Sequence, residues 1–304
     1  FLSLWSEGQP FIVGDILGAM QGSWGLDYFA DTDGSDVVSV VDCETNISSS
    51  TAVRDFFQRF ESSSNGRPLK LKVNDDWPPD TEFSMRFPQL FKAFVDVLLV
   101  PDYTHLEGVA NLTVHFPPNG VILDLGMNNV HGTQTYSQHG TTHLHLDVTF
   151  AVNLMLYAVA EEDRSPGSAV WHIFPRSMCS SICKLISESD MGKEMGDPIH
   201  NQKTYVLQEM LDPLWVEYDI VPWEIKQRPG EVMFIPAGCA HQHNSIKVAL
   251  DFLSVSDLPL TEHVRQELHI QRIITDWGED VLHFYDVLWY AWLSLSQQMK
   301  FHRN

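Results

Sequence analysis

The middle of the chain reads Gly140-Thr141-Thr142-His143-Leu144-His145-Leu146-Asp147, with apolar and polar side chains in alternation. Successive side chains of a β-strand point to opposite faces, so the leucines face one way while the two histidines and the aspartate face the other. Two imidazoles and a carboxylate are costly to bury unless they bind something. The pattern therefore predicts a strand whose polar face holds a metal ion.

A second segment with histidines reads Gly230-Glu231-Val232-Met233-Phe234-Ile235-Pro236-Ala237-Gly238-Cys239-Ala240-His241-Gln242-His243. It predicts a turn, a buried strand, a second turn and then histidines at the start of the next strand. One of these histidines would join His145 and Asp147 on one metal. Two histidines and a carboxylate are the ligand set of non-haem Fe(II) oxygenases, which leaves coordination positions for substrate and O₂. The pattern itself does not choose between His241 and His243, because they share a face of a regular strand.

Length and charge limit the classes of protein and of partner. With 304 residues and 44% hydrophobic residues, the chain can form one large β-rich domain with additions, or two domains. The net charge of −21 argues against nucleic acid as a direct ligand, because phosphate binding needs a basic surface. It favours a basic partner, or an acidic surface that keeps the protein soluble.

The four cysteines are too few and too scattered for a disulfide framework, which predicts a reducing, intracellular setting. Cys179 and Cys183 lie one helical turn apart, but no second pair is near, so we interpret them as core residues rather than zinc ligands. No signal peptide is visible, and no apolar run is long enough to span a membrane. Because the chain starts with Phe1 rather than methionine, we expect it to be part of a longer protein.

Apolar periodicity predicts many short strands framed by helices, which favours a β-sandwich or jelly roll over a βαβ fold. We expect a mainly β protein with flanking helices, in three parts. Residues 1–110 form a mixed α/β part packed on the core. Residues 111–258 form the jelly-roll core with a helical insertion at about 177–214, and residues 259–304 are helical. The predicted core strands are 121–125, 142–149, 151–159, 170–174, 231–235 and 245–255, and the predicted helices include 51–60 and 87–99.

Three further polar residues have two interpretations each. Asn153 lies in an apolar run, and an unpaired buried amide costs about 1–3 kcal/mol, so it has a partner in the protein or in a ligand. Lys247 is a charge in an apolar strand, where it lies at an edge, pairs with Asp251 or another acid, or binds a ligand. Thr142 is an ordinary strand residue unless a twist or bulge turns it to the face of His145. The ordinary alternative for His145 and Asp147 is a hydrogen-bonded pair at a strand end.

Further blocks follow one another through nearly the whole chain in the order of a known family. They are Leu69-Lys70-Leu71-Lys72, Asp76-Trp77-Pro78-Pro79, Leu99 to Thr104, Asn111-Leu112, Asp124-Leu125-Gly126, Ala151-Val152-Asn153, Trp171-His172-Ile173, Asp197-Pro198-Ile199-His200, Phe234 to Gly238, His241-Gln242, Ile246 to Ala249 and Asp251-Phe252. With the two histidine segments, the chain resembles the JmjC (jumonji C) domain of Fe(II)- and 2-oxoglutarate-dependent oxygenases. It is most similar to the branch of histone H3 lysine-9 demethylases.

The resemblance implies a double-stranded β-helix, a cupin-like jelly roll, which holds the metal at one mouth. It makes His145, Asp147 and His241 the ligands of Fe(II), since His241 directly precedes Gln242, and leaves His243 outside. It assigns Thr142 and Lys247 to the distal carboxylate of 2-oxoglutarate, with Asn153 as a further residue of that pocket.

The resemblance also implies an activity and a partner. The activity is demethylation of mono- or dimethylated lysine 9 of histone H3, by hydroxylation of the N-methyl group and release of formaldehyde, with 2-oxoglutarate and O₂ as co-substrates. The partner is then a histone H3 tail or another basic lysine-containing peptide, in the nucleus, with no direct nucleic-acid binding and no membrane.

Two departures from the pattern leave the substrate open. His143 stands where that branch usually has asparagine, and 128–132 replaces a segment containing tyrosine. A JmjC protein that hydroxylates a side chain, or one that binds with weak catalysis, is therefore the alternative. A metallo-β-lactamase-type hydrolase is a more distant alternative, because Val148 occupies the place of the last histidine in its H-x-H-x-D-H motif and no βαβ layer is found.

Overall fold

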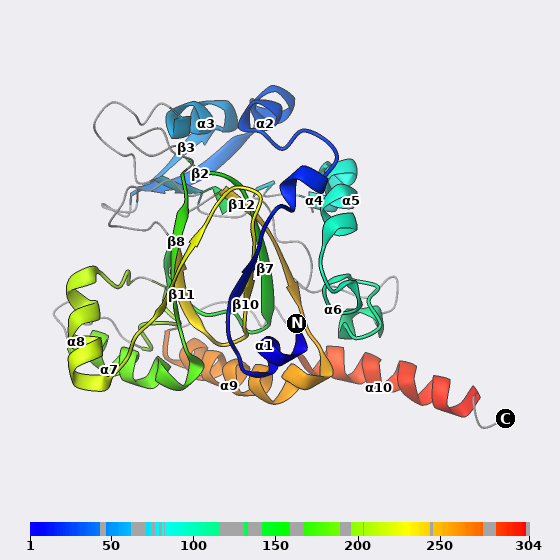
Figure 1. Ribbon diagram of the computed structural model, residues 1–304, viewed down its shortest axis with the longest axis vertical. Helices are drawn as coiled ribbons and strands as arrows, with labels where there is room; N and C mark the ends of the chain where they lie inside the picture. The colour runs from blue at the N-terminus through cyan, green and yellow to red at the C-terminus, as the bar shows by residue number, and fades with distance from the viewer. Residues whose placement is uncertain are drawn as a thin grey trace.

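Two antiparallel sheets pack face to face in the centre of the molecule (Figure 1). The computed structural model describes residues 1–42, 47–61, 71–73, 77–78, 81, 83–115, 131–132, 142–158, 167–188, 196–202, 204–243, 246–275 and 284–301. The five-stranded sheet has the order β1 (Phe11–Val13), β10 (Val232–Ile235), β7 (Phe150–Tyr157), β12 (Ile246–Phe252) and β5 (His131–Gly132). The four-stranded sheet has the order β6 (Thr142–His145), β11 (Ala240–His243), β8 (Ala169–Phe174) and β9 (Trp223–Gln227). The predicted β core with flanking helices is confirmed.

Strand β7 is buried along nearly its whole length because both of its faces are covered. Val152 and Leu154 point outward to the helices of the N-terminal part. Ala151 and Met155 point inward and pack with residues of the opposite sheet. Asn153 lies between these two in the strand and therefore also points into the space between the sheets.

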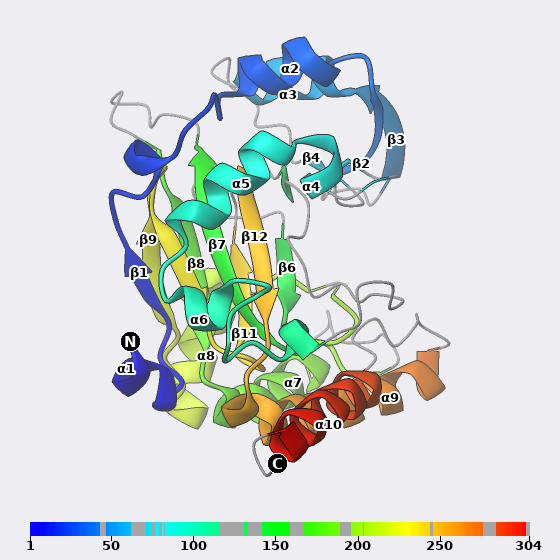
Figure 2. The ribbon, with the colours of Figure 1, turned by 90° about the vertical axis from the view of Figure 1, so that its right-hand side faces the viewer.

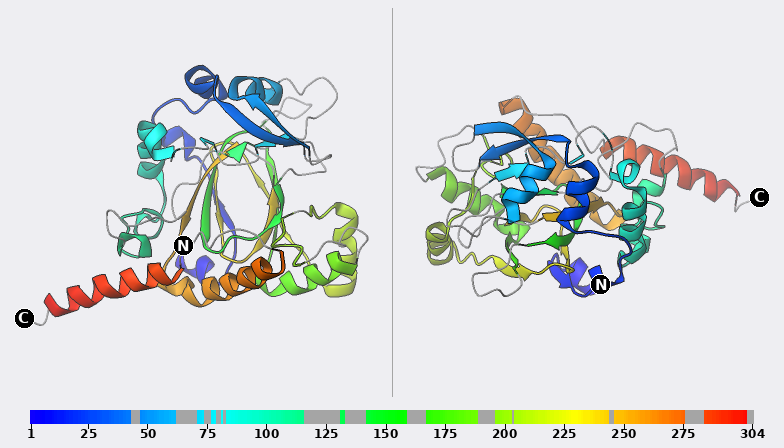
Figure 3. Two further views of the ribbon diagram at one scale, coloured as in Figure 1. Left: turned by 180° about the vertical axis from the view of Figure 1, so that it is seen from behind. Right: turned by 90° about the horizontal axis from the view of Figure 1, so that it is seen from above.

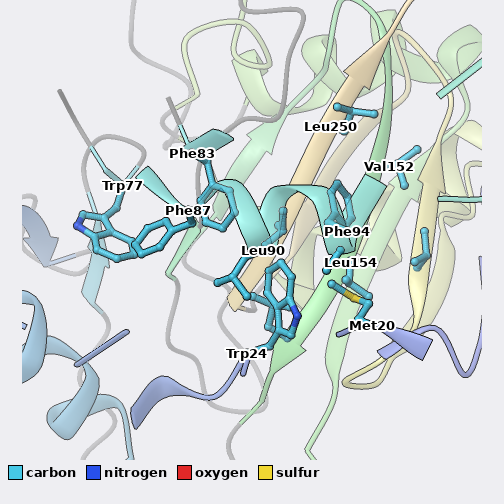
Figure 4. Close-up of a cluster of buried hydrophobic side chains, with 14 of the residues drawn as sticks. Met20, Trp24, Trp77, Phe83, Phe87, Leu90, Phe94, Val152, Leu154 and Leu250 are labelled. Atoms are coloured by element: carbon cyan, nitrogen blue, oxygen red, sulfur yellow. The ribbon is translucent and has the colours of Figure 1, made fainter. Parts of the chain in front are cut away.

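The outer face of the five-stranded sheet is covered by helices of the N-terminal part (Figure 2). Helix α5 (Pro88–Val97) crosses β7 and β12, and its buried Leu90 and Phe94 pack with Val152, Leu154 and Leu250. Figure 4 shows these side chains in the same apolar cluster as Trp24, Phe83 and Phe87. The predicted apolar face of helix 87–99 is thus confirmed.

A small three-stranded sheet lies at one end of the core. Its order is β3 (Ile47–Ala52), β2 (Val37–Asp42) and β4 (Leu71–Val73), and α2 (Leu26–Asp33) and α3 (Val53–Glu61) pack beside it. The remaining N-terminal helices are α1 (Leu2–Ser6), η1 (Leu17–Ala19), α4 (Phe83–Arg86), α6 (Pro101–Thr104) and η3 (Leu112–His115).

The helical insertion and the C-terminal helices lie at the other end. The predicted insertion contains η4 (Arg176–Met178), α7 (Cys179–Glu188) and α8 (Gln208–Tyr218), between β8 and β9. After β12 the chain forms η5 (Val255–Asp257), α9 (Leu258–Thr275) and α10 (Phe284–Phe301). Helix α10 projects from the rest of the molecule (Figure 3). No helix among the described residues is long and apolar enough to cross a membrane.

Several predicted elements differ from the observed ones. Strand 142–149 ends at His145, and helix 51–60 begins at Val53 because β3 occupies the preceding residues. Strand β3 is rich in serine and mostly exposed, so its pairing with β2, rather than its own propensity, makes it a strand. Helix α2 was not predicted, and strand 121–125 lies outside the described residues.

The proposed division into three parts is crossed by one strand. Strand β1 comes from the N-terminal part, yet it pairs with β10 in the five-stranded sheet, with Phe11 opposite Phe234. Phe11 stacks on Phe234 with 4.7 Å between the ring centroids. The boundary near residue 110 therefore separates chain segments that share one sheet, and we keep it as a proposal for the order of the parts along the chain.

The cysteines that the structure describes are free thiols. Cys179 and Cys239 are buried, and Cys183 is half-buried beside Asp197, with 3.3 Å between Sγ and Oδ2. Burial raises the pKa of the Cys239 thiol to about 12 and also raises the pKa of Cys179. Protonated buried thiols agree with the interpretation of Cys179 and Cys183 as core residues. Cys43 lies outside the described residues.

Candidate metal centre

An irregular pairing between β6 and β11 shapes the metal-binding region. His241 lies opposite His145, but His243 lies opposite Thr142 instead of His143, so two residues of β6 lie opposite the single residue Gln242 of β11. This is a β-bulge, and one extra residue in a strand reverses the side on which the residues beyond it point. Thr142 thereby comes to the side of His145. The sequence alone named a bulge as the condition for this orientation.

Asp147 lies beyond the end of β6, where the chain bends toward the turn before β11. Its backbone carbonyl accepts a hydrogen bond from the Gly238 N–H at 2.9 Å. Gly238 has a φ of 69°, a left-handed conformation that favours glycine, and a Cβ there would lie 3.0 Å from side-chain atoms of Arg176 and Val264. The alternating pattern predicted that Asp147 lies on the same strand as His145. Instead, this loop contact holds its carboxylate close to both histidines.

The three predicted ligands form one group. The ligand atoms of His145, Asp147 and His241 all lie within 4.8 Å of one another. Nε2 of His145 is 3.9 Å from one oxygen of Asp147, and Nε2 of His241 is 3.7 Å from the other. These distances are too long for hydrogen bonds, which disfavours the ordinary pair at a strand end. They leave space for an ion that binds each atom at about 2.0–2.2 Å.

Hydrogen bonds orient both imidazoles toward this space. Nδ1 of His145 bonds to the His143 carbonyl at 2.8 Å, and Nδ1 of His241 bonds to the Cys239 carbonyl at 3.0 Å. A carbonyl oxygen only accepts, so each Nδ1 carries the hydrogen and each Nε2 carries the lone pair. This is the tautomer in which histidine binds a metal through Nε2.

Burial decreases across the group from one side to the other. The exposed fraction of the side chain is 1% for His241, 16% for His145 and 28% for Asp147, so the group opens to solvent on the side of Asp147. Burial lowers the pKa of His241, and the charge of Lys247 lowers it further, against the opposing effect of Asp147. His241 is therefore neutral at pH 7 and able to bind a cation.

Lys247 and Asn153 lie in the space between the sheets, near this group. Lys247 is buried, and its Nζ lies over the ring of Trp171, 5.2 Å from the centroid. Since β12 lies between β7 and β5, Lys247 is not on an edge strand, which excludes one of its ordinary interpretations. Asn153 is also buried, and its side-chain oxygen has no hydrogen-bond partner among the residues that the structure describes. The buried ammonium of Lys247 suits a ligand with a negative charge.

The helical insertion is hydrogen-bonded to the strands that carry the two histidines. The side chain of Gln242 forms two hydrogen bonds of 2.8 Å with the backbone of Val206. The Leu144 N–H donates to the Thr204 carbonyl at 2.7 Å, and the ring of His143 bonds to the Gln202 carbonyl at 2.9 Å. Gln202, Thr204 and Val206 thus bind both strands. In the sequence, Gln242 was noted only as the residue that follows His241 in a matching block.

Some predicted residues lie outside the described part of the chain. The side chain of His243 and the segment 128–130 are among them. Two residues of the region were not predicted as functional: Trp171, which was noted only as part of a matching block, and Gln227, which bonds to it.

Comparison with known proteins shows which proteins this chain is similar to. A family model described as "JmjC domain, hydroxylase" matches residues 150–252, which include His241 and begin just after Asp147. Lysine-specific demethylase 3A of Gallus gallus is 32% identical over 340 residues, which cover 96% of this chain and 26% of that protein. The Homo sapiens protein of the same name is also 32% identical, with the same coverage. Lysine-specific demethylase 3 of Drosophila melanogaster is 28% identical over 96% of this chain and 40% of that protein. The chain thus spans about a quarter of the length of the vertebrate relatives.

Proposed function

Since this chain belongs to the JmjC domain family, we propose that it is an Fe(II)- and 2-oxoglutarate-dependent dioxygenase that demethylates lysine. The group of His145, Asp147 and His241 is the single observation that carries this proposal. Lysine 9 of histone H3, in its mono- or dimethylated form, is the proposed substrate, in line with the branch that the sequence resembles. The names of the relatives support lysine demethylation.

The ligand set fits Fe(II). Two neutral imidazoles and one carboxylate suit this ion and leave coordination positions open. Fe(II) with 2-oxoglutarate and O₂ supplies the oxidising power that hydroxylates an N-methyl carbon, which then leaves as formaldehyde, while succinate and CO₂ are formed. The residues of the chain hold His145 and His241 in one tautomer through the carbonyls of His143 and Cys239. They also keep the inner side of the group dry, because His241 is buried.

We assign the co-substrate to the space between the sheets. The Lys247 ammonium would bind the distal carboxylate of 2-oxoglutarate, and the Thr142 hydroxyl, turned by the bulge, would bind the same group. Asn153 is buried beside the same space, and the amide N–H₂ is the part of its side chain that would donate to this acceptor-only ligand. A ligand with a carboxylate at each end would accept hydrogen bonds from the ammonium, the hydroxyl and this amide N–H₂.

The test is mass spectrometry of methylated histone peptides incubated with the protein, Fe(II), ascorbate and 2-oxoglutarate. We expect the loss of one or two methyl groups, and the same peptide without 2-oxoglutarate serves as the control. Gain of one oxygen without loss of methyl would instead identify a side-chain hydroxylase. Binding of the peptide without either change would identify a binding module with weak catalysis.

The proposed partner is a basic peptide, and we expect its binding to weaken with salt. The chain has 40 acidic against 19 basic residues, and helix α8 alone exposes Glu209, Asp212 and Glu217. An acidic field attracts cationic ligands and is screened by ions. The apparent peptide affinity should fall about tenfold between about 50 and 300 mM salt.

Peptides that differ only in the basic residues beside the methyl-lysine separate this effect from general salt effects. The peptide without these residues should bind more weakly at low salt and respond less to salt. If neither salt nor flanking charge changes the affinity, the acidic surface serves solubility alone. A histone substrate also places the proposed activity in the nucleus, and we expect no direct nucleic-acid binding by this chain.

A further inference from the structure

Gln227 uses its buried amide to connect the two sheets. It is the last residue of β9 and is fully buried. Its Nε2 donates to the backbone carbonyl of Asn153 at 2.9 Å and to that of Glu231 at 2.8 Å. Asn153 belongs to β7 of the opposite sheet, and Glu231 directly precedes β10 of that sheet. These two bonds hold the amide in one orientation.

The other end of the same amide holds an indole. Oε1 of Gln227 accepts a hydrogen bond from Nε1 of Trp171 at 2.9 Å, and Trp171 is fully buried. A buried indole N–H needs such an acceptor, and this one sets the direction in which the ring plane lies. Residues of three strands, β7, β8 and β9, and the residue that precedes β10 therefore meet at one side chain.

The ring of Trp171 in turn contacts the two ends of the proposed site. The Nζ of Lys247 lies over the ring, 5.2 Å from its centroid. The imidazole of His241 lies on the same indole, with 5.9 Å between centroids and 40° between planes. A lysine side chain has many rotamers, and an aromatic face beneath its ammonium restricts them. A rotation of the indole would release both contacts.

We propose that Gln227 is a positioning residue for 2-oxoglutarate, acting through Trp171 on Lys247. It touches neither the metal ligands nor, in this proposal, the co-substrate. Its amide fixes the indole, and the indole keeps the ammonium in the place where the distal carboxylate binds. This inference rests on the proposed function, because it assumes that Lys247 binds 2-oxoglutarate.

The first test replaces Gln227 by methionine, which has a similar volume and no hydrogen-bonding amide. Binding of 2-oxoglutarate to the Fe(II)-loaded protein is measured by calorimetry without O₂, so that no turnover occurs. We expect the Kd of 2-oxoglutarate to rise about tenfold, the usual effect of removing a side chain that orients a ligand-binding group.

Gln271→Met is the matched control. Gln271 is also a buried glutamine, and its Oε1 accepts a hydrogen bond from the Asp197 N–H at 2.8 Å, but it lies on α9 away from Trp171. The control should lower the Tm and leave the Kd unchanged. Equal Kd values for the wild type and Gln227→Met would overturn the inference, as would an equal rise of the Kd in the control.

A second variant keeps the inference testable if Gln227→Met does not fold. Trp171→Phe retains an aromatic ring but has no N–H for Gln227 to hold. We expect it to weaken 2-oxoglutarate binding, and Gln227→Met should add no further loss in the Trp171→Phe background, because its effect passes through the indole. Independent, additive losses in the double variant, or wild-type binding by Trp171→Phe, would contradict the inference. A wild-type protein that does not bind 2-oxoglutarate would instead refute the proposed function.

Discussion

Alanine at His145, Asp147 or His241 abolishes 2-oxoglutarate turnover. Each of the three side chains contributes one of the atoms that lie within 4.8 Å of one another, and two ligands alone hold Fe(II) poorly. Substitution of residues that merely support a metal ligand costs about 10–100-fold, so loss of a ligand should cost more than about a hundredfold. The measurements are succinate formation and the iron content of the purified protein.

His243→Ala is the matched control for this prediction. It removes a histidine two residues from His241 on the same strand, and the resemblance to the JmjC family places this residue outside the ligand set. The variant should remain folded and retain its iron. If it loses iron as completely as His241→Ala does, the wrong histidine has been assigned as the third ligand.

Replacing Lys247 by methionine should raise the Kd of 2-oxoglutarate more than it harms the fold. A charge-assisted contact contributes about 1.5–3 kcal/mol, which corresponds to roughly a ten- to a hundredfold change in affinity. Methionine has an apolar side chain of similar length and removes the ammonium that lies over Trp171. The Kd is measured by calorimetry on the Fe(II)-loaded protein without O₂, and the Tm of each variant is measured beside it.

Lys226→Met supplies the control for charge alone. Lys226 is exposed on β9, so its substitution changes the net charge equally without touching the space between the sheets. It should bind 2-oxoglutarate like the wild type. Unchanged binding by Lys247→Met as well would return Lys247 to a structural ion pair within the protein.

The two proposals about Lys247 and Gln227 fail in different ways. Loss of affinity in Lys247→Met with wild-type affinity in Gln227→Met would keep the lysine as the carboxylate partner and remove the need for the indole to be held. Loss of affinity in Gln227→Met alone would show that Trp171 acts on the ligand directly. The contact between Lys247 and Trp171 makes loss in both variants the expected result.

Local sequence was sufficient for β6, β7, β8, β10 and β12 and for two of the proposed metal ligands, whereas β9 was not predicted. The alternation around Leu144 and Leu146 predicted a strand with one buried face, and both leucines are buried in one cluster. The apolar run at 151–159 predicted a core strand, and the structure shows that β7 is buried along nearly its whole length. His145 and Asp147 followed from the same alternation. Hydrophobic periodicity is a property of neighbouring residues, so it can be read without knowledge of the partner strand.

Pairing between distant segments decided the orientation of Thr142, the place of Asp147 and the order of the strands in the sheets. The bulge between β6 and β11 turns Thr142 to the side of His145. The hydrogen bond from the Gly238 N–H to the Asp147 carbonyl holds Asp147 beyond the end of β6. Strand β1 pairs with β10, which lies more than two hundred residues later in the chain. Register and bulges depend on the partner strand and its turns, so no single segment contains them.

The surroundings of Lys247 show most clearly what local sequence predicts and what only tertiary structure decides. Its sequence indicated a charge in an apolar strand and left an edge position, an ion pair and a ligand contact open. Only the order of the five-stranded sheet made β12 an inner strand, and only the packing of the two sheets placed Trp171 beneath the ammonium. The pairing of β8 with β9 placed Gln227 beside the indole. These contacts join residues from three strands, 171, 227 and 247, and tertiary packing alone brings such residues together.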